Sequence, residues 1–484
     1  MSAIINDQRI NRLIESGNPS PGAPADIVKD PERVAAVKAE LQAAGVEYCY
    51  ASYVDIHGRP KAKCTPIEKF EKMCAGSELF TVGAMEGMGL SGPQEDECAA
   101  VPDLDTGVIL PWDRTRAWFT GQLYYHGEPY PNDSRVILKR MVERAEARGI
   151  RVNLGFEPEY YVLRGESGNG LDTITQDYFG TCPAYDIDLT EDAFPYLSRM
   201  REYMDELGWN VYSFDQEGGD GQYEFDFGYT DVMSSADQFV FMRLMAKRVA
   251  RDFDARASFM PKPFPAEFRS GAHFNISLED METGENLFAP GENPDPMAQM
   301  HGINFSRLAF NFTAGVLRHA GAITALTCPT YNSYQGLLAQ GEMVDQSWAP
   351  VVIAYGRNNR SAMLRMPANR YCIENRAPDM SCNPYLAAAL HIAAGLEGID
   401  EDLDPGKPLN DNAYDLGDIP LSEQREALLP RTLLHALEAF DADPLVEDVL
   451  GEFKSIYVRQ KLGEWESEFY RVGDEYRRRT LWTI

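Results

Sequence analysis

An acidic, glycine-rich segment near the middle of the chain restricts the possible folds more than any other stretch. Residues 214–227 read FDQEGGDGQYEFDF, and Glu217 and Glu224 stand on either side of three glycines. Glycines let a backbone turn tightly between two strands, so both carboxylates can return to one side of a hairpin. Taken alone, this pattern also fits a hairpin whose acids face solvent. Acidic residues elsewhere in the chain are needed to decide.

Length and charge exclude several classes of protein. The chain has 484 residues, enough for two domains and a large core. Its formal net charge of −30 argues against a nucleic-acid partner and against anionic membranes, because both require clustered Lys and Arg. Eight cysteines without a CxxC pair, and a first segment without the order of an export signal, favour a reduced, cytoplasmic protein.

Composition shifts divide the chain into three parts. Residues 1–30 are polar and contain SGNPSPGAPAD, which is typical of a flexible arm. A Gly/Pro break near 127–133 separates an N-terminal domain, 31–130, from a second domain, 131–484. Short strands with helices at the periphery predict an α+β fold.

Several elements can be placed from pattern alone. A short helix is expected from Asp30 to about Leu41, followed by two strands around a His57-Gly58 turn. A helix over 234–252 would start at Ser234 or Ser235, and a single long helix is expected over about 303–326. Short strands are expected over 151–164, 256–260, 271–278, 350–355, 361–366 and 371–376.

Three of these strands carry acids or a histidine. Glu157 and Glu159 alternate in FEPEYY, so they point to one face of a strand. His273 lies in RSGAHFNIS and Glu374 in RYCIENRAPD. Each has an ordinary alternative: an exposed edge strand, a buried structural histidine, or an ion pair with Arg376. Together, five carboxylates and one imidazole suit Mg²⁺ or Mn²⁺ better than zinc.

The same chemistry suits phosphoryl transfer. Two divalent cations can bridge phosphate oxygens. Arg360 and Arg365, in GRNNRSAMLRMP, can each bind two such oxygens through bidentate hydrogen bonds. Ion pairing at the surface of an acidic protein is the alternative for these arginines. The sequence contains no P-loop and no protein-kinase signature set.

Taken in order, the motifs resemble the glutamine synthetase superfamily over roughly residues 45–400. The segments that carry the resemblance are EPE at 157–159, GQYE at 221–224, SFMPKPF at 258–264, GAHFNIS at 271–277, NNRSAMLRMP at 358–367, IENRAPD at 373–379 and NPYLAAAL at 383–390. Each motif is modest, but the ordered set is highly specific. The resemblance implies a small β-grasp-like N-terminal domain and a catalytic domain with a curved antiparallel sheet.

The resemblance also implies roles for individual residues. The first metal would be held by Glu159, Glu217 and Glu224, and the second by Glu157, His273 and Glu374. Arg360, Arg365 and Arg376 would handle the γ-phosphate and the acyl phosphate, with Glu159, Arg360 and Arg376 near glutamate. ATP would lie near Tyr229, Lys262, Asn275, Ser277 and Arg365.

Further implications concern assembly and the amine. Family members form double-ringed homo-oligomers, typically dodecamers in the bacterial type, with active sites between subunits. Asp55 in YVDIHG matches the aspartate that a neighbouring subunit supplies to bind and deprotonate the amine. The reaction joins glutamate to an amine with ATP through γ-glutamyl phosphate.

Three departures from the family pattern point to the amine and to the glutamate contact. Trp348, in QSWAP, replaces the flap glutamate that guards the ammonium site. Gly336 replaces the arginine that meets the glutamate α-carboxylate, and Arg269 stands where a glycine is usual. Arg269 is therefore expected to replace the missing carboxylate partner, and Trp348 to cover an alkyl group. Trp348 can also be a flap packing residue with no influence on amine choice.

These departures resemble the γ-glutamylamide synthetases, and methylamine is the expected amine. The alternatives are ammonia, as in glutamine synthetase itself, and ethylamine, isopropylamine, putrescine or aniline. Other classes are a regulator on the same fold, which the complete ligand set disfavours, and a two-metal phosphatase or hydrolase, which would not consume ATP.

Overall fold

The computed structural model describes most of the chain as two structural units. It covers residues 30–81, 84–85, 88, 96–164, 172–175, 183–265, 267–293, 295–337, 348–415, 427–473, 477 and 480–481. The first unit runs to Val136 without residues 56–59, and the second contains residues 56–59 and everything from Ile137 onward. The predicted arm, residues 1–30, lies outside the described residues except for Asp30.

The first unit is a mixed sheet with helices packed on one face. Its strands follow the order β2-β1-β6-β4-β3, with β5 and β7 also paired to β6, and β1 runs parallel to β6. A buried cluster joins Val34 and Leu41 of α2 and Phe70 of α3 to Phe119 of β6. The elements are α2 (Pro31–Ala43), β1 (Tyr48–Val54), β2 (Pro60–Pro66), α3 (Phe70–Cys74), β3 (Leu79–Thr81), β4 (Glu97–Pro102), β5 (Val108–Ile109), β6 (Arg116–Tyr125) and β7 (Glu128–Pro129).

Two predictions for this unit are confirmed. Helix α2 begins where expected because the Asp30 carboxylate accepts a hydrogen bond from the Arg33 amide and Pro31 occupies the first turn. Strands β1 and β2 pair antiparallel on either side of the 56–59 turn, with Val54 opposite Pro60.

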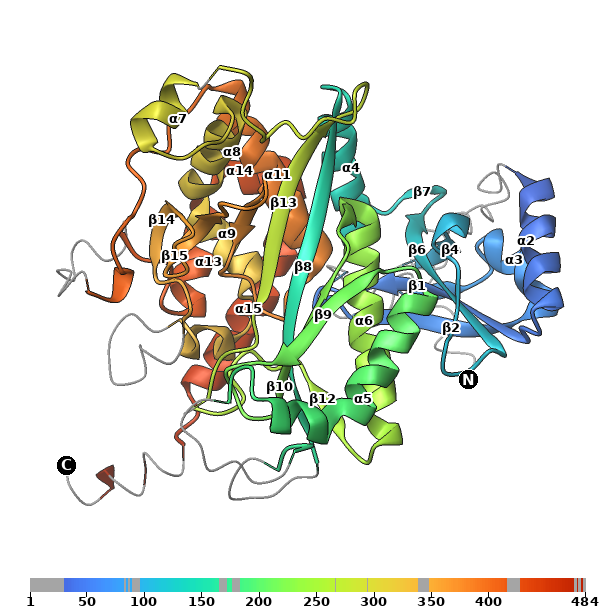
Figure 1. Cartoon of the computed structure of the whole chain (residues 1–484). Coiled ribbons are helices and arrows are strands. Elements are labelled where there is room, and N and C mark those ends of the chain that lie inside the picture. Colours follow the sequence, from blue (N-terminus) through green and yellow to red (C-terminus); the bar gives the residue numbers. More distant parts are fainter. Residues whose placement is uncertain are drawn as a thin grey trace, which may run out of the picture. The chain divides into compact units, whose positions relative to one another are not determined.

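The second unit is built on a nine-stranded sheet. Its order is β14-β15-β16-β13-β8-β10-β9, with β11 and β12 also paired to β8. Figure 1 shows the long strands β8 and β13 running side by side through this unit. The strands are β8 (Ile150–Leu163), β9 (Val211–Gln216), β10 (Gln222–Phe227), β11 (Thr230–Asp231), β12 (Arg256–Ser258), β13 (Ala272–Asp280), β14 (Val352–Arg357), β15 (Ala362–Met366) and β16 (Ile373–Asn375).

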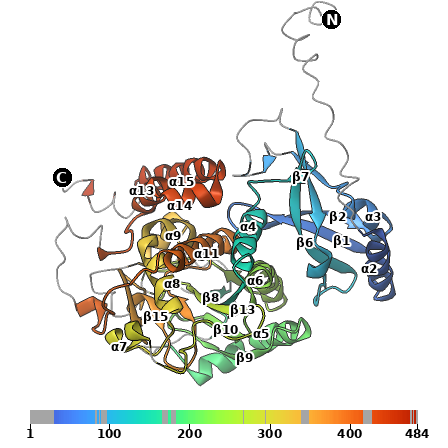
Figure 2. The same cartoon turned by 90° about the horizontal axis from the view of Figure 1, so that it is seen from above.

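Helices of this unit surround the sheet and cover one face of its central strands (Figure 2). They are α4 (Ser134–Glu146), α5 (Ile187–Glu206), α6 (Val232–Asp252), α7 (Pro296–His301), α8 (Arg307–Arg318), α9 (Ala320–Thr327), α11 (Pro384–Asp400), α13 (Leu433–Ala442), α14 (Pro444–Leu450) and α15 (Phe453–Phe469). Among the described residues, no helix is both long and apolar enough to cross a membrane. The predicted α+β fold is confirmed.

Aromatic residues show which face of the sheet is the core. Phe156 of β8 and Phe274 of β13 lie opposite each other, with ring centroids 4.8 Å apart. Phe156 also packs on Phe239 of α6, and Phe274 on His391 of α11. Because side chains alternate along a strand, the residues next to these phenylalanines point away from α6 and α11.

Two helix predictions are wrong in detail. The helix expected over 303–326 is broken at His319 into α8 and α9, where the His319 ring bonds to Glu397 and Asp443 at 2.9 and 2.7 Å. Helix α6 begins at Val232, earlier than Ser234, because the Asp231 side chain caps it. The first difference coincides with tertiary contacts of His319, and the second comes from a local cap.

Candidate active site

The registers of the sheet place the predicted ligands on its second face, away from α6 and α11. His273 of β13 lies opposite Glu157 of β8, and Glu224 of β10 lies opposite Glu159 of β8. Glu374 of β16 lies opposite Asn275, two residues after His273. Since opposed residues and residues two apart share a face of a sheet, four strands deliver these side chains to one place.

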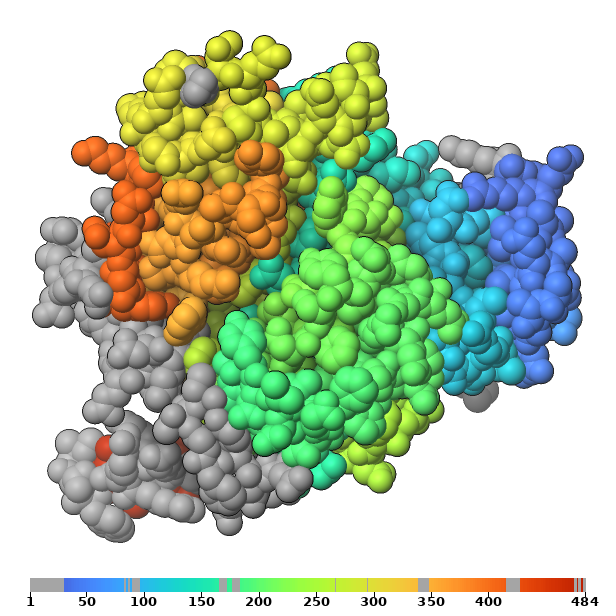
Figure 3. Space-filling model, in the orientation of Figure 1, coloured from blue at the N-terminus to red at the C-terminus, as the bar shows by residue number. Residues whose placement is uncertain are grey.

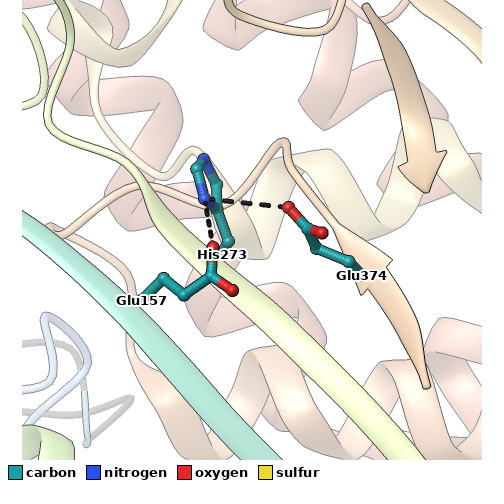
Figure 4. Close-up of side chains that lie close together, drawn as sticks. All are labelled: Glu157, His273 and Glu374. Carbon is teal, nitrogen blue, oxygen red and sulfur yellow. Dashed lines mark hydrogen bonds and ion pairs between the residues drawn. The ribbon is translucent and has the colours of Figure 1, made fainter. Parts of the chain in front are cut away.

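One group consists of Glu157, His273 and Glu374, whose ligand atoms lie within 4.8 Å of one another. His273 Nδ1 is 3.1 Å from Glu157 Oε2 and 3.9 Å from Glu374 Oε1 (Figure 4). All three side chains are largely buried, and the Glu374 carboxylate is fully so. These are the three residues expected to hold the second metal.

The other group consists of Glu159, Glu224 and His273. Glu159 and Glu224 are two of the three residues expected to hold the first metal. His273 Nε2 is 3.4 Å from Glu159 Oε1, so the imidazole stands between the two groups. Glu217, the third residue expected here, follows β9 and accepts a hydrogen bond from the Gly218 amide at 2.9 Å. It is close enough to Glu159 for the two charges to interact.

The carboxylates of Glu159, Glu217 and Glu224 lie close enough together that a cation or protons must neutralise their charges. Burial and the charge of Glu159 raise the pKa of Glu217 to about 8. The same two causes raise the pKa of Glu224 well above its usual value. Like charges held together in a buried place are unfavourable unless something positive neutralises them. The donor set, hard oxygens and one imidazole, fits a divalent cation such as Mg²⁺ or Mn²⁺.

Arginines neutralise the group formed by Glu157, His273 and Glu374. The guanidinium groups of Arg365 and Arg376 lie 2.5 and 2.6 Å from the two oxygens of Glu374. Although burial raises the pKa of Glu374, the charge of Arg376 holds it below its usual value. Arg376 Nε also donates to the carbonyl of Arg360, at 3.1 Å. The three predicted arginines are therefore neighbours on the β14–β16 side of the sheet.

Arg370 is a fourth arginine that the sequence did not reveal. Its guanidinium lies 2.8 Å from Glu157 Oε1 and 3.0 Å from Asn275 Oδ1. Burial raises the pKa of Glu157, but His273 and Arg370 lower it to about 2. A basic residue just before the strand that carries Glu374 was the available signal.

Gly271 lets the backbone approach the carboxylates closely. Its amide donates to Glu159 Oε2 at 2.8 Å. A Cβ atom at this position would lie 2.9 Å from Glu159 Oε2 and 3.0 Å from His273 Nε2, so any side chain here would require one of these groups to move. In Figure 3 the surface is hollowed between the orange segment that contains β14 and β15 and the green segment that contains α5 and β9.

Trp348 and Arg360 line one cavity of about 530 Å³. Trp348 is 54% exposed and has a φ of 44°, a left-handed backbone that bulky residues rarely adopt. The other residues that line it all carry polar groups: Arg357, Asn358, Asn359, Ser361, Asn410, Asp411, Asn412 and Tyr414.

Apart from Arg365, which pairs with Glu374, the residues expected near ATP fall into two places. Asn275 and Ser277 extend the ligand face along β13, and Tyr229, 67% exposed, lies against Gly155 beside Asn275. Lys262 lies elsewhere, in the segment before β13. It is buried, its amide donates to Asn332 at 2.7 Å and its ammonium donates to the carbonyl of Glu267.

Arg269 and Asp55 are both buried. The Arg269 guanidinium donates to the carbonyl of Ala377 at 2.8 Å and lies 3.8 Å from Asp379. Asp55 belongs to the first unit, where Lys61 Nζ is 3.5 Å from its carboxylate. The expected substrate contacts of both residues stay predictions.

A family model described as "Glutamine synthetase, catalytic domain" matches residues 131–479. The match covers the whole ligand face, from β8 to β16, and well over half of the chain. The chain belongs to the glutamine synthetase family. The predicted resemblance is confirmed.

Named relatives agree with this assignment. Glutamate–methylamine ligase of Methyloversatilis universalis is 36% identical over 429 residues, which are 89% of this chain and 95% of that protein. Glutamine synthetase of Rhizobium leguminosarum bv. phaseoli is 35% identical over 426 residues, 87% of this chain and 93% of that protein. Relatives with both names therefore resemble this glutamine synthetase family member almost equally.

Solved structures match its fold. The complex of GmaS with ADP superposes with a TM-score of 0.83 at 30% identity, covering 92% of this chain and 99% of that one. GmaS without ligand gives a TM-score of 0.81 at 31% identity, with the same coverage.

Proposed function

We propose that this protein is an ATP-dependent ligase that joins the γ-carboxylate of glutamate to a small amine, with methylamine as the preferred amine. The observation that carries the proposal is the cluster around His273 and Glu374. There, carboxylates on three strands and the imidazole of a fourth, His273, meet two guanidinium groups. Such a site can neutralise the negative charges of reacting phosphate and carboxylate groups. ATP-dependent formation of an amide from glutamate brings such groups together.

The carboxylates would hold two divalent cations, Mg²⁺ or Mn²⁺. Glu157, His273 and Glu374 would hold one, and Glu159, Glu224 and Glu217 the other. When bound, the cations supply positive charge that offsets the phosphate and carboxylate charges. The raised pKa values of Glu217 and Glu224 support this assignment, because burial and neighbouring carboxylates outweigh the charge of Arg376 at Glu217 and raise the pKa of both acids.

Arg360, Arg365 and Arg376 would orient and neutralise the transferred phosphoryl group. The glutamate γ-carboxylate attacks the γ-phosphorus of ATP, ADP leaves, and γ-glutamyl phosphate forms. Arg376 is well suited to this role because its own position is fixed by Glu374 and by the Arg360 carbonyl. Tyr229, Asn275 and Ser277 would contact the nucleotide, with Lys262 further along.

The second step needs an uncharged amine. An alkylammonium ion has a pKa near that of Lys, about 10, so it must lose a proton before it attacks. Asp55 of a neighbouring copy would accept that proton, and phosphate then leaves as the amide bond forms. Trp348 would cover the methyl group beside Arg360, whose cavity it shares.

This assignment includes self-association. A double-ringed homo-oligomer, with twelve copies as the expected number, would bring Asp55 of one copy to the ligand face of the next. The second candidate is glutamine synthesis with ammonia, supported by the near-equal identity to the Rhizobium enzyme.

An amine panel tests the proposal. ATP turnover is measured with glutamate and ammonium, methylamine, ethylamine, isopropylamine, putrescine or aniline in turn. We expect ADP release in equal amount to amide, with the highest kcat/KM for methylamine. Ammonium as the best substrate would support the second candidate, and ATP-independent turnover would contradict both.

A further inference from the structure

A line of cations runs along one face of α6, on a chain whose net charge is −30. Arg243, Lys247 and Arg251 are spaced four residues apart, so they are neighbours on the helix surface. Like charges at this spacing destabilise a helix. Burial lowers the pKa of Lys247, and the charges of Arg243, Arg59 and Arg251 lower it further.

The adjacent position on the same helix behaves differently. Arg248 lies 2.5 Å from Asp252, an ordinary ion pair between residues four apart. Among the residues that the structure describes, neither Lys247 nor Arg251 forms such a pair, and Lys247 instead lies 5.4 Å from the centre of the Phe259 ring. Arg243 is buried and donates to the carbonyls of Met380 and Cys382 at 3.0 and 3.2 Å. At Lys247 and Arg251, therefore, no carboxylate of the described helix residues relieves the repulsion.

The outer end of this line opens into a cavity of about 650 Å³. Three cations line it, Lys247, Arg251 and Arg256, together with one acid, Asp254, and two alanines. Asp254 has a φ of 54°, which turns the chain sharply between α6 and β12. None of these residues belongs to the ligand face of the candidate active site.

We propose that Lys247, Arg251 and Arg256 form a binding site for a small anion with at least two negative charges, such as phosphate or a di- or tricarboxylate. A bound anion of this class removes the repulsion between the three cations and receives charge-assisted hydrogen bonds from them. A singly charged anion such as chloride offsets less of the positive charge of Lys247 and Arg251 and binds more weakly. The site is separate from the proposed reaction and does not depend on it.

Calorimetric titration with inorganic phosphate tests the proposal on the full-length protein at constant ionic strength. The wild type is compared with the double variant Lys247→Gln/Arg251→Gln and with Arg248→Gln, which removes a cation of the same helix from outside the cavity. Under the proposed function the active site binds phosphate as well, so the wild type is expected to show two classes of sites. The double variant should lose one class, or bind it at least tenfold more weakly, and Arg248→Gln should keep both.

The unfolding temperature supplies a second readout, because the double variant should lose phosphate binding without losing stability in chloride buffer. In chloride buffer the double variant should be as stable as the wild type or more stable, because it removes like charges, and it should gain less in Tm from phosphate. Gln is a good helix former, so the helix is retained. The proposal is wrong if the double variant binds phosphate like the wild type. It is also wrong if sedimentation shows loss of an assembly with phosphate binding unchanged, because the cations would then contact a second copy.

Discussion

Gly336 leaves the space that the side chain of Arg269 occupies, and any side chain at position 336 would compete for it. A Cβ atom on Gly336 would lie 2.9 Å from the Cβ atom and 3.3 Å from the Cδ atom of Arg269. The glycine at 336 and the arginine at 269 are therefore physically coupled. If the family resemblance is followed, a guanidinium that usually comes from position 336 comes here from position 269.

Replacing Arg269 tests whether this guanidinium binds glutamate. A charge-assisted hydrogen bond contributes about 1.5–3 kcal/mol, so Arg269→Ala should raise the KM for glutamate roughly tenfold or more with a smaller change in kcat. The control is Arg151→Ala, which removes an ion pair with Glu279 on the same sheet. An unchanged KM would mean that Arg269 only holds the Ala377 carbonyl and Asp379 in the protein interior.

A single methyl group at Gly271 should disable the site. In Gly271→Ala the new Cβ atom meets both a Glu159 oxygen and His273 Nε2 at about 3.0 Å, so at least one ligand must move. We expect loss of Mn²⁺ binding, followed by titration calorimetry, and loss of ATP-dependent amide formation. Gly291→Ala is the matched control, because its Cβ atom would contact nothing within 4 Å. Normal Mn²⁺ binding by Gly271→Ala would remove Glu159 or His273 from the ligand set.

Glu224→Gln should have opposite effects on stability and activity. The variant keeps the shape of the side chain but removes a buried negative charge near Glu159 and Glu217. The metal-free variant should therefore unfold at a higher temperature than the metal-free wild type, yet gain little from Mn²⁺ and form no amide. Glu279→Gln, on the same sheet but paired with Arg151, should respond to Mn²⁺ like the wild type. Retained activity in Glu224→Gln would exclude this residue as a ligand.

The metal-free protein should lose stability as the pH rises. The pKa of Glu217 is raised from 4.5 to about 8, so between these values the folded state binds a proton that the unfolded state does not. Stability therefore falls with rising pH across this window. Divalent cations displace that proton, so Mn²⁺ affinity should increase with pH, by up to about tenfold per pH unit for one proton released.

Unfolding temperatures measured from pH 5 to 8, with Mn²⁺ and with a chelator, check this prediction. His319 is a second source of pH dependence, since its carboxylate partners raise its pKa although burial lowers it. It loses its stabilising charge as the pH rises, but equally with and without metal. The difference between the two series isolates the acid cluster. A difference that does not grow with pH would contradict the prediction.

The strands of the site could be predicted from sequence, but their partners could not. Alternation places Glu157 and Glu159 on one face of β8 without any other information. That His273 stands opposite Glu157, and Glu224 opposite Glu159, depends on registers between segments more than 60 residues apart in the chain. The family resemblance supplied the grouping that local pattern lacks.

Two features that sequence reasoning missed are set by tertiary contacts. Arg370 reaches Glu157 and Asn275 from outside the strand that carries Glu374, so no periodicity marks it. The break at His319 follows from bonds to Glu397 and Asp443, which lie 78 and 124 residues away. Propensity predicts a continuous helix there, and side chains from other helices override it.

Amine choice is the property that one substitution should change most directly. Trp348 stands where a flap glutamate is expected, and it shares a cavity with Arg360. Trp348→Glu replaces an apolar ring with a charge that attracts ammonium and leaves the methyl group of methylamine without a contact. Because contact with one methyl group is worth about 1–3 kcal/mol, the ratio of kcat/KM for methylamine to that for ammonium should fall roughly 10- to 200-fold.

Trp348→Phe, the control, keeps an aromatic ring and should preserve the preference for methylamine. Neither variant changes the strain at this position, where φ is 44°, since both new residues carry a Cβ atom. An unchanged ratio in Trp348→Glu would show that Trp348 only lines the cavity, and amine choice would then have to come from the neighbouring copy that carries Asp55.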